Sequence, residues 1–385
     1  MRISLPYGRQ PLAVDVPDDA AVIAVPVAPP TGDVLSLCRQ AMDGPVAAPS
    51  LEVVARTARR ATIIVSDATR ADPQGAMAAA VIERLPQTCA VTLAIATGTH
   101  GPCNLDRLDI PAAVLDRVTT IINHDGHAAD DARLVGHTTR GTPIRVNAQA
   151  LDTDLLILTG RILPHYFAGF GAGVKALYPG LGEARSVRAN HALKRDPAAR
   201  AGIVDGNPCR EDMEEALAMI SPPAYLLNVV AAPGGGLAGA VAGDVRQAFR
   251  TGADLGRRAW RVRAARAGAI VVSDHLPVTE SLYQASKLVA AVAPLCEDHA
   301  TIVVAAECER GIGPVDVVNE GIYEIGLRPR LPADHRIVLV SSRAASEVNA
   351  TYCEPARSVE EALAAASGPI AVVPEAGSLI VEASE

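Results

Sequence analysis

Three short apolar runs, each passing directly into a polar or glycine-rich stretch, constrain the fold of this chain most. They are residues 61–67 (ATIIVSD), 91–100 (VTLAIATGTH) and 155–165 (LLILTGRILPH), and the segment between the first two has a helical pattern. Apolar runs of this length and content are typical of strands buried on both faces of a sheet. We therefore predict an α/β fold, with mixed or parallel sheets flanked by helices and functional loops after the carboxyl ends of the strands.

A second α/β pattern opens at residues 269–274 (AIVVSD) and continues with strands at 302–307 and 337–342. Before it, residues 228–244 predict a β-hairpin that leads into a helix. We place the domain boundary in a basic helix over residues 258–268 (RAWRVRAARAG). The sequence thus predicts two domains, residues 1–262 and 263–385, with the active site in the cleft between them.

Composition excludes several classes of protein. The formal net charge is −8 and there is no long basic run, which argues against a nucleic-acid-binding surface. The seven cysteines are scattered without a CxxC pair, as expected of a protein in a reducing cytosol. The N-terminus lacks the apolar core of a signal peptide. Residues 217–243 carry no charge, but Pro222, Pro223 and Pro233 interrupt them too often for a membrane helix. We expect a cytoplasmic protein.

Reactive side chains are concentrated in residues 162–191. This segment contains His165, Lys175 and His191, together with glycines at 169, 171 and 173. Imidazole is a proton shuttle or a metal ligand near neutral pH, and glycine lets the backbone approach a ligand closely. The segment therefore predicts a cofactor site.

Polar residues also follow the first two strands. Asp67 and Arg70 lie in SDATR, where Arg70 can bind a carboxylate with two hydrogen bonds; alternatively, Asp67 or Thr69 caps the helix that follows. His100 ends ATGTH, the next strand and loop, so we expect it at the same edge of the sheet as Arg70.

A further pair lies in LYQASK, which begins a helix of the second domain. Gln284 and Lys287 are three residues apart, so they share one helix face and can close over a substrate, or are simply exposed. Two glycine patterns carry no such prediction. Gly234, Gly236 and Gly239 follow Pro233 in a hairpin-like context, and GFGAGVK has neither the spacing nor the Ser/Thr of a P-loop.

Taken in order, these motifs resemble the nickel-pincer-nucleotide lactate racemase family, and the resemblance covers nearly the whole chain. The motifs are LPYG, SDATR, ATGTH, NHD (123–125), PHYFAGFGAGVKALYPG, NH (190–191), GNPCRED, VAGD and LYQASK. A single motif of this kind is weak, but nine in order are specific.

The resemblance implies a fold, a cofactor and a set of roles. Residues 1–262 would be the catalytic and cofactor-binding domain, and residues 263–385 would close over the substrate. The cofactor is a nickel pincer nucleotide joined to Lys175 through a thioamide, with His191 as the protein ligand of the nickel. The resemblance makes His100 and His165 the acid/base residues. It places Asp67 near the cofactor, and Arg70, Gln284 and Lys287 near the substrate. We also expect Gly171 and Gly173 to bind the cofactor, because glycine lets the backbone approach closely, and Tyr283 to bind the substrate.

The implied reaction is racemisation or epimerisation of a 2-hydroxy acid. The α-hydrogen leaves as hydride while a base takes the hydroxyl proton, and return of the hydride to the other face inverts the carbon. Because the hydroxyl group differs in position between the two enantiomers, two histidines serve one enantiomer each. A sulfur-rich square-planar site with one imidazole suits Ni(II).

Some positions depart from the family pattern. Ala71 stands where proline is common, and Ala172 and Val174 stand in place of glycine and arginine before Lys175. The one tryptophan, Trp260, lies at the domain boundary, so the C-terminal part has none to line a lactate pocket. We therefore expect a 2-hydroxy acid other than lactate as the substrate.

Two other functions stay open. One is an NAD-type dehydrogenase, although a glycine fingerprint after a strand is missing. The other is a non-catalytic protein of the same fold that binds a hydroxy acid or a nucleotide. The partners that we expect are the small-molecule substrate and the enzymes that make the cofactor, whereas the sequence does not indicate an oligomeric state.

Overall fold

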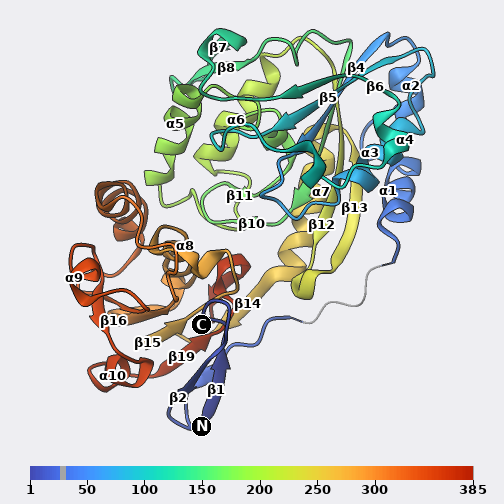
Figure 1. Ribbon diagram of the computed structural model, residues 1–385. Helices are drawn as coiled ribbons and strands as arrows, with labels where there is room; N and C mark the ends of the chain where they lie inside the picture. Colours follow the sequence, from blue (N-terminus) through green and yellow to red (C-terminus); the bar gives the residue numbers. More distant parts are fainter. Residues whose placement is uncertain (27–31, 385) are drawn as a thin grey trace. The chain divides into compact units, whose positions relative to one another are not determined.

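The computed structural model describes residues 1–26 and 32–384 (Figure 1). The chain forms two compact units, a larger one of residues 27–259 and a smaller one that combines residues 1–26 with 260–385. Within the described residues, each unit contains a six-stranded sheet with helices packed against it. The predicted α/β fold is therefore confirmed. Residues 27–31 and 385 belong to the predicted domains but lie outside the described residues.

The sheet of the larger unit has the order β13-β12-β9-β4-β5-β6. Neighbouring strands are parallel from β12 to β6, and β13 is antiparallel to β12. Chain order reverses between β4 and β9, and the crevice at the carboxyl ends of such strands is where ligands bind in open α/β sheets. The strands are β4 (Arg60–Ser66), β5 (Ala90–Ala96), β6 (Val118–Asn123), β9 (Leu155–Ile162), β12 (Ala224–Ala231) and β13 (Leu237–Gly243).

Helices flank this sheet within the unit, with α1 and α3 on one side and α5 and α6 on the other (Figure 1). Their ends follow from local sequence: the Asp33 carboxylate accepts the N–H of Ser36 at the start of α1, and Asn207 caps α6, whose first residue is a proline. The helices are α1 (Val34–Asp43), α2 (Leu51–Ala55), α3 (Gln74–Ile82), α4 (Ala112–Leu115), α5 (Ala184–Ala192), α6 (Pro208–Ala218) and α7 (Val245–Trp260).

The core of the larger unit lies mainly between the sheet and helices α1 and α3. It includes Ile63 and Val65 from β4, Leu93 from β5, and Met42 and Met77 from the helices, all fully buried. Two short hairpins complete the unit, β7 (Ala132–His137) with β8 (Pro143–Asn147), and β10 (Pro164–His165) with β11 (Gly169–Phe170). The second hairpin follows β9 directly and therefore stands at the carboxyl edge of the sheet.

The smaller unit has a sheet of order β18-β17-β16-β15-β19-β3, with parallel pairing between neighbours. Its strands are β15 (Ala267–Val272), β16 (Cys296–Ala305), β17 (Arg336–Val340), β18 (Glu354–Ala356), β19 (Ile370–Val373) and β3 (Ala21–Val22). Its helices are α8 (Leu282–Val292), α9 (Ala345–Val348), α10 (Val359–Ala364) and a π-helix over Val317–Leu327. Two two-stranded sheets are added, β1 (Arg2–Leu5) with β2 (Leu12–Asp15) and β14 (Arg261–Ala264) with β20 (Ile380–Ala383).

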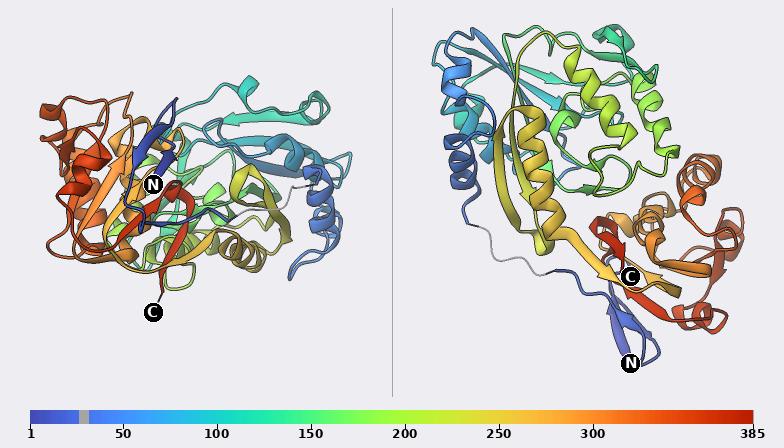
Figure 2. Two further views of the ribbon diagram at one scale, coloured as in Figure 1. Left: turned by 90° about the horizontal axis from the view of Figure 1, so that it is seen from below. Right: turned by 180° about the vertical axis from the view of Figure 1, so that it is seen from behind.

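The N-terminal residues differ from the prediction, because they belong to the smaller unit (Figure 2). Strand β3 pairs with β19, and Leu5 and Val14 are buried in the core of that unit. Residues 1–262 are therefore not one continuous domain. A two-residue edge strand carries too little pattern to reveal which sheet it joins.

The segment predicted as a basic helix also differs. Helix α7 ends at Trp260, and residues 261–264 continue as strand β14. The arginines at 261 and 263 are exposed while the residues between and after them are partly buried, which is the alternation of a strand. In the described part of the chain, no helix is both long enough and apolar enough to cross a membrane.

Candidate active site

Asp67 and His100 form a hydrogen-bonded pair in the loops after β4 and β5. Asp67 is 2% exposed, and its Oδ2 lies 2.7 Å from Nδ1 of His100. Its Oδ1 accepts the N–H of Thr69 at 2.9 Å. Burial opposes ionisation of Asp67, but these hydrogen bonds prevail and lower its pKa. The ionised carboxylate therefore holds the Nδ1 proton of His100, which leaves Nε2 as the proton-accepting atom.

These contacts decide between two interpretations of SDATR. Helix α3 starts only at Gln74, after Pro73, and receives no side-chain cap, so neither Asp67 nor Thr69 caps it. Arg70 lies in the same loop, is exposed, and forms no ion pair within residues 1–26 and 32–384. Its guanidinium is therefore able to bind an anionic ligand.

A second group of reactive residues surrounds Phe167. The β10–β11 hairpin carries His165, whose Nε2 lies 3.1 Å from Nζ of Lys175, and His165 Nδ1 accepts the N–H of Ala168 at 3.3 Å. The Phe167 ring is 4% exposed. Its centroid lies 4.6 Å from that of His165 and 4.9 Å from that of His191, and Nζ of Lys175 lies 5.5 Å from it. One buried ring thus contacts all three predicted residues.

His191 lies in the last turn of α5, a helix that begins where the Glu183 carboxylate accepts the N–H groups of Arg185 and Ser186. Burial lowers the pKa of His191 to about 3, so the imidazole is neutral at pH 7. Its Nε2 is buried and has no hydrogen-bond partner in the described part of the chain. A neutral, unsatisfied ring nitrogen is a natural metal ligand.

No cluster of three or more His, Cys, Asp or Glu residues able to hold a metal occurs within the described ranges.

The turn that carries Lys175 has an unusual backbone. It is a 3₁₀ turn over Gly173–Ala176, and Gly173 has φ +64°. A Cβ at Gly173 would lie 2.5 Å from the Phe249 ring, so packing alone requires this glycine. Ala172 has φ +58° and ψ −157°, a region that side chains other than glycine rarely occupy. Val174 is 2% exposed, so the departure from arginine falls on a buried position.

Packing does not explain why residue 171 is a glycine, in contrast to residue 173. A Cβ there would first meet the carbonyl oxygen of Arg161, at 3.4 Å, so packing leaves the position nearly open. The predicted contact of Gly171 with the cofactor stays a prediction.

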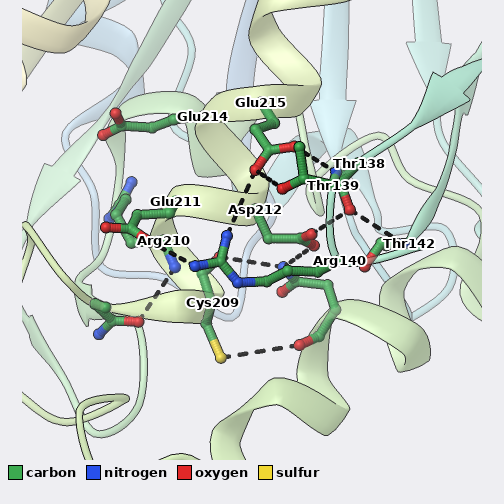
Figure 3. Close-up of polar contacts among 12 residues, drawn as sticks. Thr138, Thr139, Arg140, Thr142, Cys209, Arg210, Glu211, Asp212, Glu214 and Glu215 are labelled. Atoms are coloured by element: carbon green, nitrogen blue, oxygen red, sulfur yellow. Dashed lines mark hydrogen bonds and ion pairs between the residues drawn. The ribbon is translucent and has the colours of Figure 1, made fainter.

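Several residues beneath this site were not identified from sequence as functional. Asp212 of α6 is fully buried and accepts hydrogen bonds from Asn190, at 2.8 Å, and from Thr138 (Figure 3). Arg210, two residues earlier, is also fully buried. The signal available was the motif GNPCRED, which sequence reasoning used only as a helix start and a family motif.

The remaining predicted substrate residues lie on α8 of the smaller unit. Lys287 donates a hydrogen bond to Oε1 of Gln284, so these two side chains do share a helix face. Tyr283 is 44% exposed. Their contact with a substrate, and the cleft between domains, stay predictions.

The chain matches known proteins along its length. A family model described as the lactate racemase N-terminal domain matches residues 7–202. A lactate racemase from Thermoanaerobacterium thermosaccharolyticum is 27% identical, and the alignment covers 98% of this chain and 99% of that protein. A lactate racemase from Lactiplantibacillus plantarum is 29% identical, with 83% and 77% covered.

Two solved structures are similar to this chain as well. The lactate racemase apoprotein from T. thermosaccharolyticum superposes with a TM-score of 0.89 at 26% identity, over 99% of this chain and 100% of that one. A Thermotoga maritima protein superposes with a TM-score of 0.65 at 15% identity, over 94% and 100%, and thus shares the fold.

Proposed function

Since this chain belongs to the lactate racemase family, we propose that it is an isomerase that racemises or epimerises a 2-hydroxy acid with a nickel pincer nucleotide attached to Lys175. The observation that carries the proposal is the grouping of His165, Lys175 and His191 around one phenylalanine ring. An acid/base, an amine for covalent attachment and a metal ligand then lie within one small region.

The residues present fit such a cofactor. Lys175 would hold it covalently, and His191 would supply the imidazole ligand, since its Nε2 is buried and lacks a partner among the described residues. When bound, the cofactor would accept the α-hydrogen with its electron pair and return it to either face. The protein must then move the hydroxyl proton and hold the substrate still.

Proton transfer falls to the two histidines. Asp67 fixes the Nδ1 proton of His100, so Nε2 of His100 would accept the hydroxyl proton of one enantiomer and return it afterwards. His165 would serve the other enantiomer through Nε2, the atom that faces Lys175, in the tautomer that carries its proton on Nδ1 and no longer accepts the N–H of Ala168. Acylation of Lys175 would remove the positive charge that its amine can carry, which suits a site where His165 must gain and lose a proton.

Substrate binding would depend on cations. Arg70 is exposed and forms no ion pair within the described ranges, so we assign it the substrate carboxylate. Gln284, Lys287 and Tyr283 are the proposed substrate residues of the smaller unit. The absence of tryptophan after Trp260 and the changes at Ala172 and Val174 support a substrate other than lactate. We also propose a cytoplasmic location, where the cofactor-making enzymes would load the protein.

The test begins with peptide mass spectrometry of protein produced together with the cofactor's maturation enzymes. We expect a nickel-containing adduct on Lys175 and none on Lys175→Ala, which should also lose turnover. A chiral screen of 2-hydroxy acids that includes lactate then identifies the substrate. An unmodified Lys175, beside a properly loaded control racemase, would refute the mechanism and favour a binding protein. Turnover retained in Lys175→Ala would refute the proposed role of this lysine.

A further inference from the structure

Arg210 is a fully buried guanidinium on α6 with no part in the proposed reaction. It forms no ion pair with a carboxylate in the described residues. Burial lowers its pKa to about 10, so it still carries its charge at neutral pH. A buried charge that forms no ion pair is costly unless hydrogen bonds satisfy it. The hydrogen bonds of the guanidinium show what this buried charge holds in place.

The guanidinium binds two backbone carbonyls. Its Nη2 donates to the carbonyl oxygen of Phe170, and its Nη1 donates to that of Ala172 at 3.3 Å. Its flat face lies against the Phe249 ring, with the central carbon 4.0 Å from the ring centroid. Since Phe249 also packs against Gly173, the same ring supports both the guanidinium and the start of the lysine turn.

These two carbonyls belong to the elements that carry the reactive side chains. Phe170 pairs with Pro164 in the hairpin, and the neighbouring pair is Gly169 with His165. The carbonyl oxygen of Ala172 also accepts the N–H of Lys175, at 3.3 Å. Arg210 is thus one backbone hydrogen bond away from Lys175, and it contacts the strand opposite His165.

The backbone between the two carbonyls needs such support. Ala172 is held at φ +58°, and a strained residue of this kind persists only where its surroundings fix it. Arg210 binds its carbonyl group, and Oδ1 of Asn228 accepts the N–H of Gly173 at 2.9 Å. Because the guanidinium is charged, its hydrogen bonds to the two carbonyl groups are stronger than hydrogen bonds between neutral groups.

The start of α6 also fixes the other parts of the site (Figure 3). Asn190, which precedes His191, donates to Asp212 at 2.8 Å and to the carbonyl oxygen of Cys209 at 3.1 Å. The cap residue Asn207 donates to the carbonyl oxygen of Phe167 at 2.9 Å. One segment, residues 207–212, therefore contacts backbone or side-chain groups within three residues of each of the three reactive residues.

We propose that Arg210 is a positioning residue, which sets the separation of His165 and Lys175 by binding the carbonyls of Phe170 and Ala172. Its importance for catalysis rests on the proposed function, but its effect on the lysine turn does not. Arg210 touches neither substrate nor cofactor in this assignment; it acts through the backbone.

The first test is hydrogen exchange of the apoprotein, followed by mass spectrometry of the peptides that cover residues 168–178. Arg210→Met keeps the volume but removes the donors, so we expect exchange in these peptides to rise by about tenfold or more. Arg210→Lys retains a charge that reaches one carbonyl and should give an intermediate rise. Met213→Ala, a fully buried change one turn along α6, is the matched control for lost stability.

The variants are compared at temperatures equally far below their own Tm. A rise confined to residues 168–178 in Arg210→Met, absent from Met213→Ala, supports the proposal. If these peptides exchange in Arg210→Met at the wild-type rate, or if exchange rises equally in Met213→Ala, the proposal is wrong. If Arg210→Met fails to fold, Arg210→Lys decides by the same criterion.

The second test uses protein loaded with the cofactor. We expect a lower fraction of Lys175 carrying the adduct in Arg210→Met, and in the loaded fraction a lower kcat with little change in KM. Arg210→Lys should recover part of both. Wild-type loading and kcat in Arg210→Met would overturn the catalytic half of the proposal. A wild-type protein without racemase activity would instead refute the proposed function, and the exchange result would still decide the positioning role.

Discussion

Ala172→Gly should make this protein more stable, which is the opposite of what glycine usually does. Ala172 has φ +58° and ψ −157° directly before the turn that carries Lys175. In this region the Cβ of an L-residue crowds its own backbone, so glycine is strongly preferred. Hydrogen bonds from Arg210 and to Asn228 hold the chain there regardless of the side chain. The substitution therefore removes strain without removing the contacts that define the turn.

The magnitude follows from two opposing effects. A side chain held in such a region costs about 1–3 kcal/mol. Glycine gives the unfolded chain more freedom, which costs about 0.5–1 kcal/mol. The difference between these ranges is about 0–2.5 kcal/mol, and we expect a gain near its middle, about 1 kcal/mol, in the free energy of unfolding. For a domain of this size, about 1 kcal/mol corresponds to a rise in Tm of about 2–4 °C.

The assay is urea unfolding of the apoprotein, with Ala79→Gly as the control. Ala79 lies within α3, where the backbone is helical and glycine should lower the free energy of unfolding by about 0.5–1 kcal/mol. The two substitutions are chemically identical and should have opposite signs. If Ala172→Gly is as stable as the wild type or less so, the backbone at residue 172 is not strained and the reasoning is wrong.

Three further changes test other contacts. Asp67→Asn removes the charge that orients His100, so kcat of the loaded enzyme should fall by about 10²-fold; an unchanged kcat would show that the pair is only structural. Phe167→Leu should cost about 1–3 kcal/mol of stability and also lower kcat, whereas Phe170→Leu should lower stability alone; equal kcat values in the two variants would contradict the role of Phe167. Burial lowers the pKa of His124, so the stability due to its neutral form is complete above the pKa of the unfolded chain and is lost as the pH falls from there through the folded pKa. Urea unfolding between pH 7 and 5 should therefore show a smaller loss of stability in His124→Gln than in the wild type, and equal losses would refute this assignment.

Much of the fold could be predicted from sequence because buried parallel strands have a strong pattern. The apolar runs at 61–67 and 155–165 correspond to β4 and β9, and their polar ends lie at the carboxyl edge of the sheet. Strands β3 and β14 could not be found in this way. Strand β3 has only two residues. Strand β14 contains two arginines, and arginine occurs in exposed helices as well as in edge strands, so its presence does not distinguish the two.

The candidate site shows the same division. His165, Lys175 and His191 stand in one glycine-rich segment, so their proximity could be expected from sequence and from the family resemblance. The roles of Phe167 and Arg210 depend on contacts in three dimensions. Arg210 binds carbonyls almost forty residues earlier in the chain, and no spacing rule relates a side chain to a distant backbone group.

The pairing of β3 with β19 also determines the order in which the protein folds during synthesis. The larger unit is continuous, so it can fold once the ribosome has released residue 259. Residues 21–22 must wait for residues 371–372, which are made about 350 residues later. At about 5–20 residues per second this delay is about 20–70 s. Strand β3, one of the first strands to be made, therefore cannot pair until β19 follows it, and the nascent chain keeps this edge strand unpaired after the larger unit is able to fold.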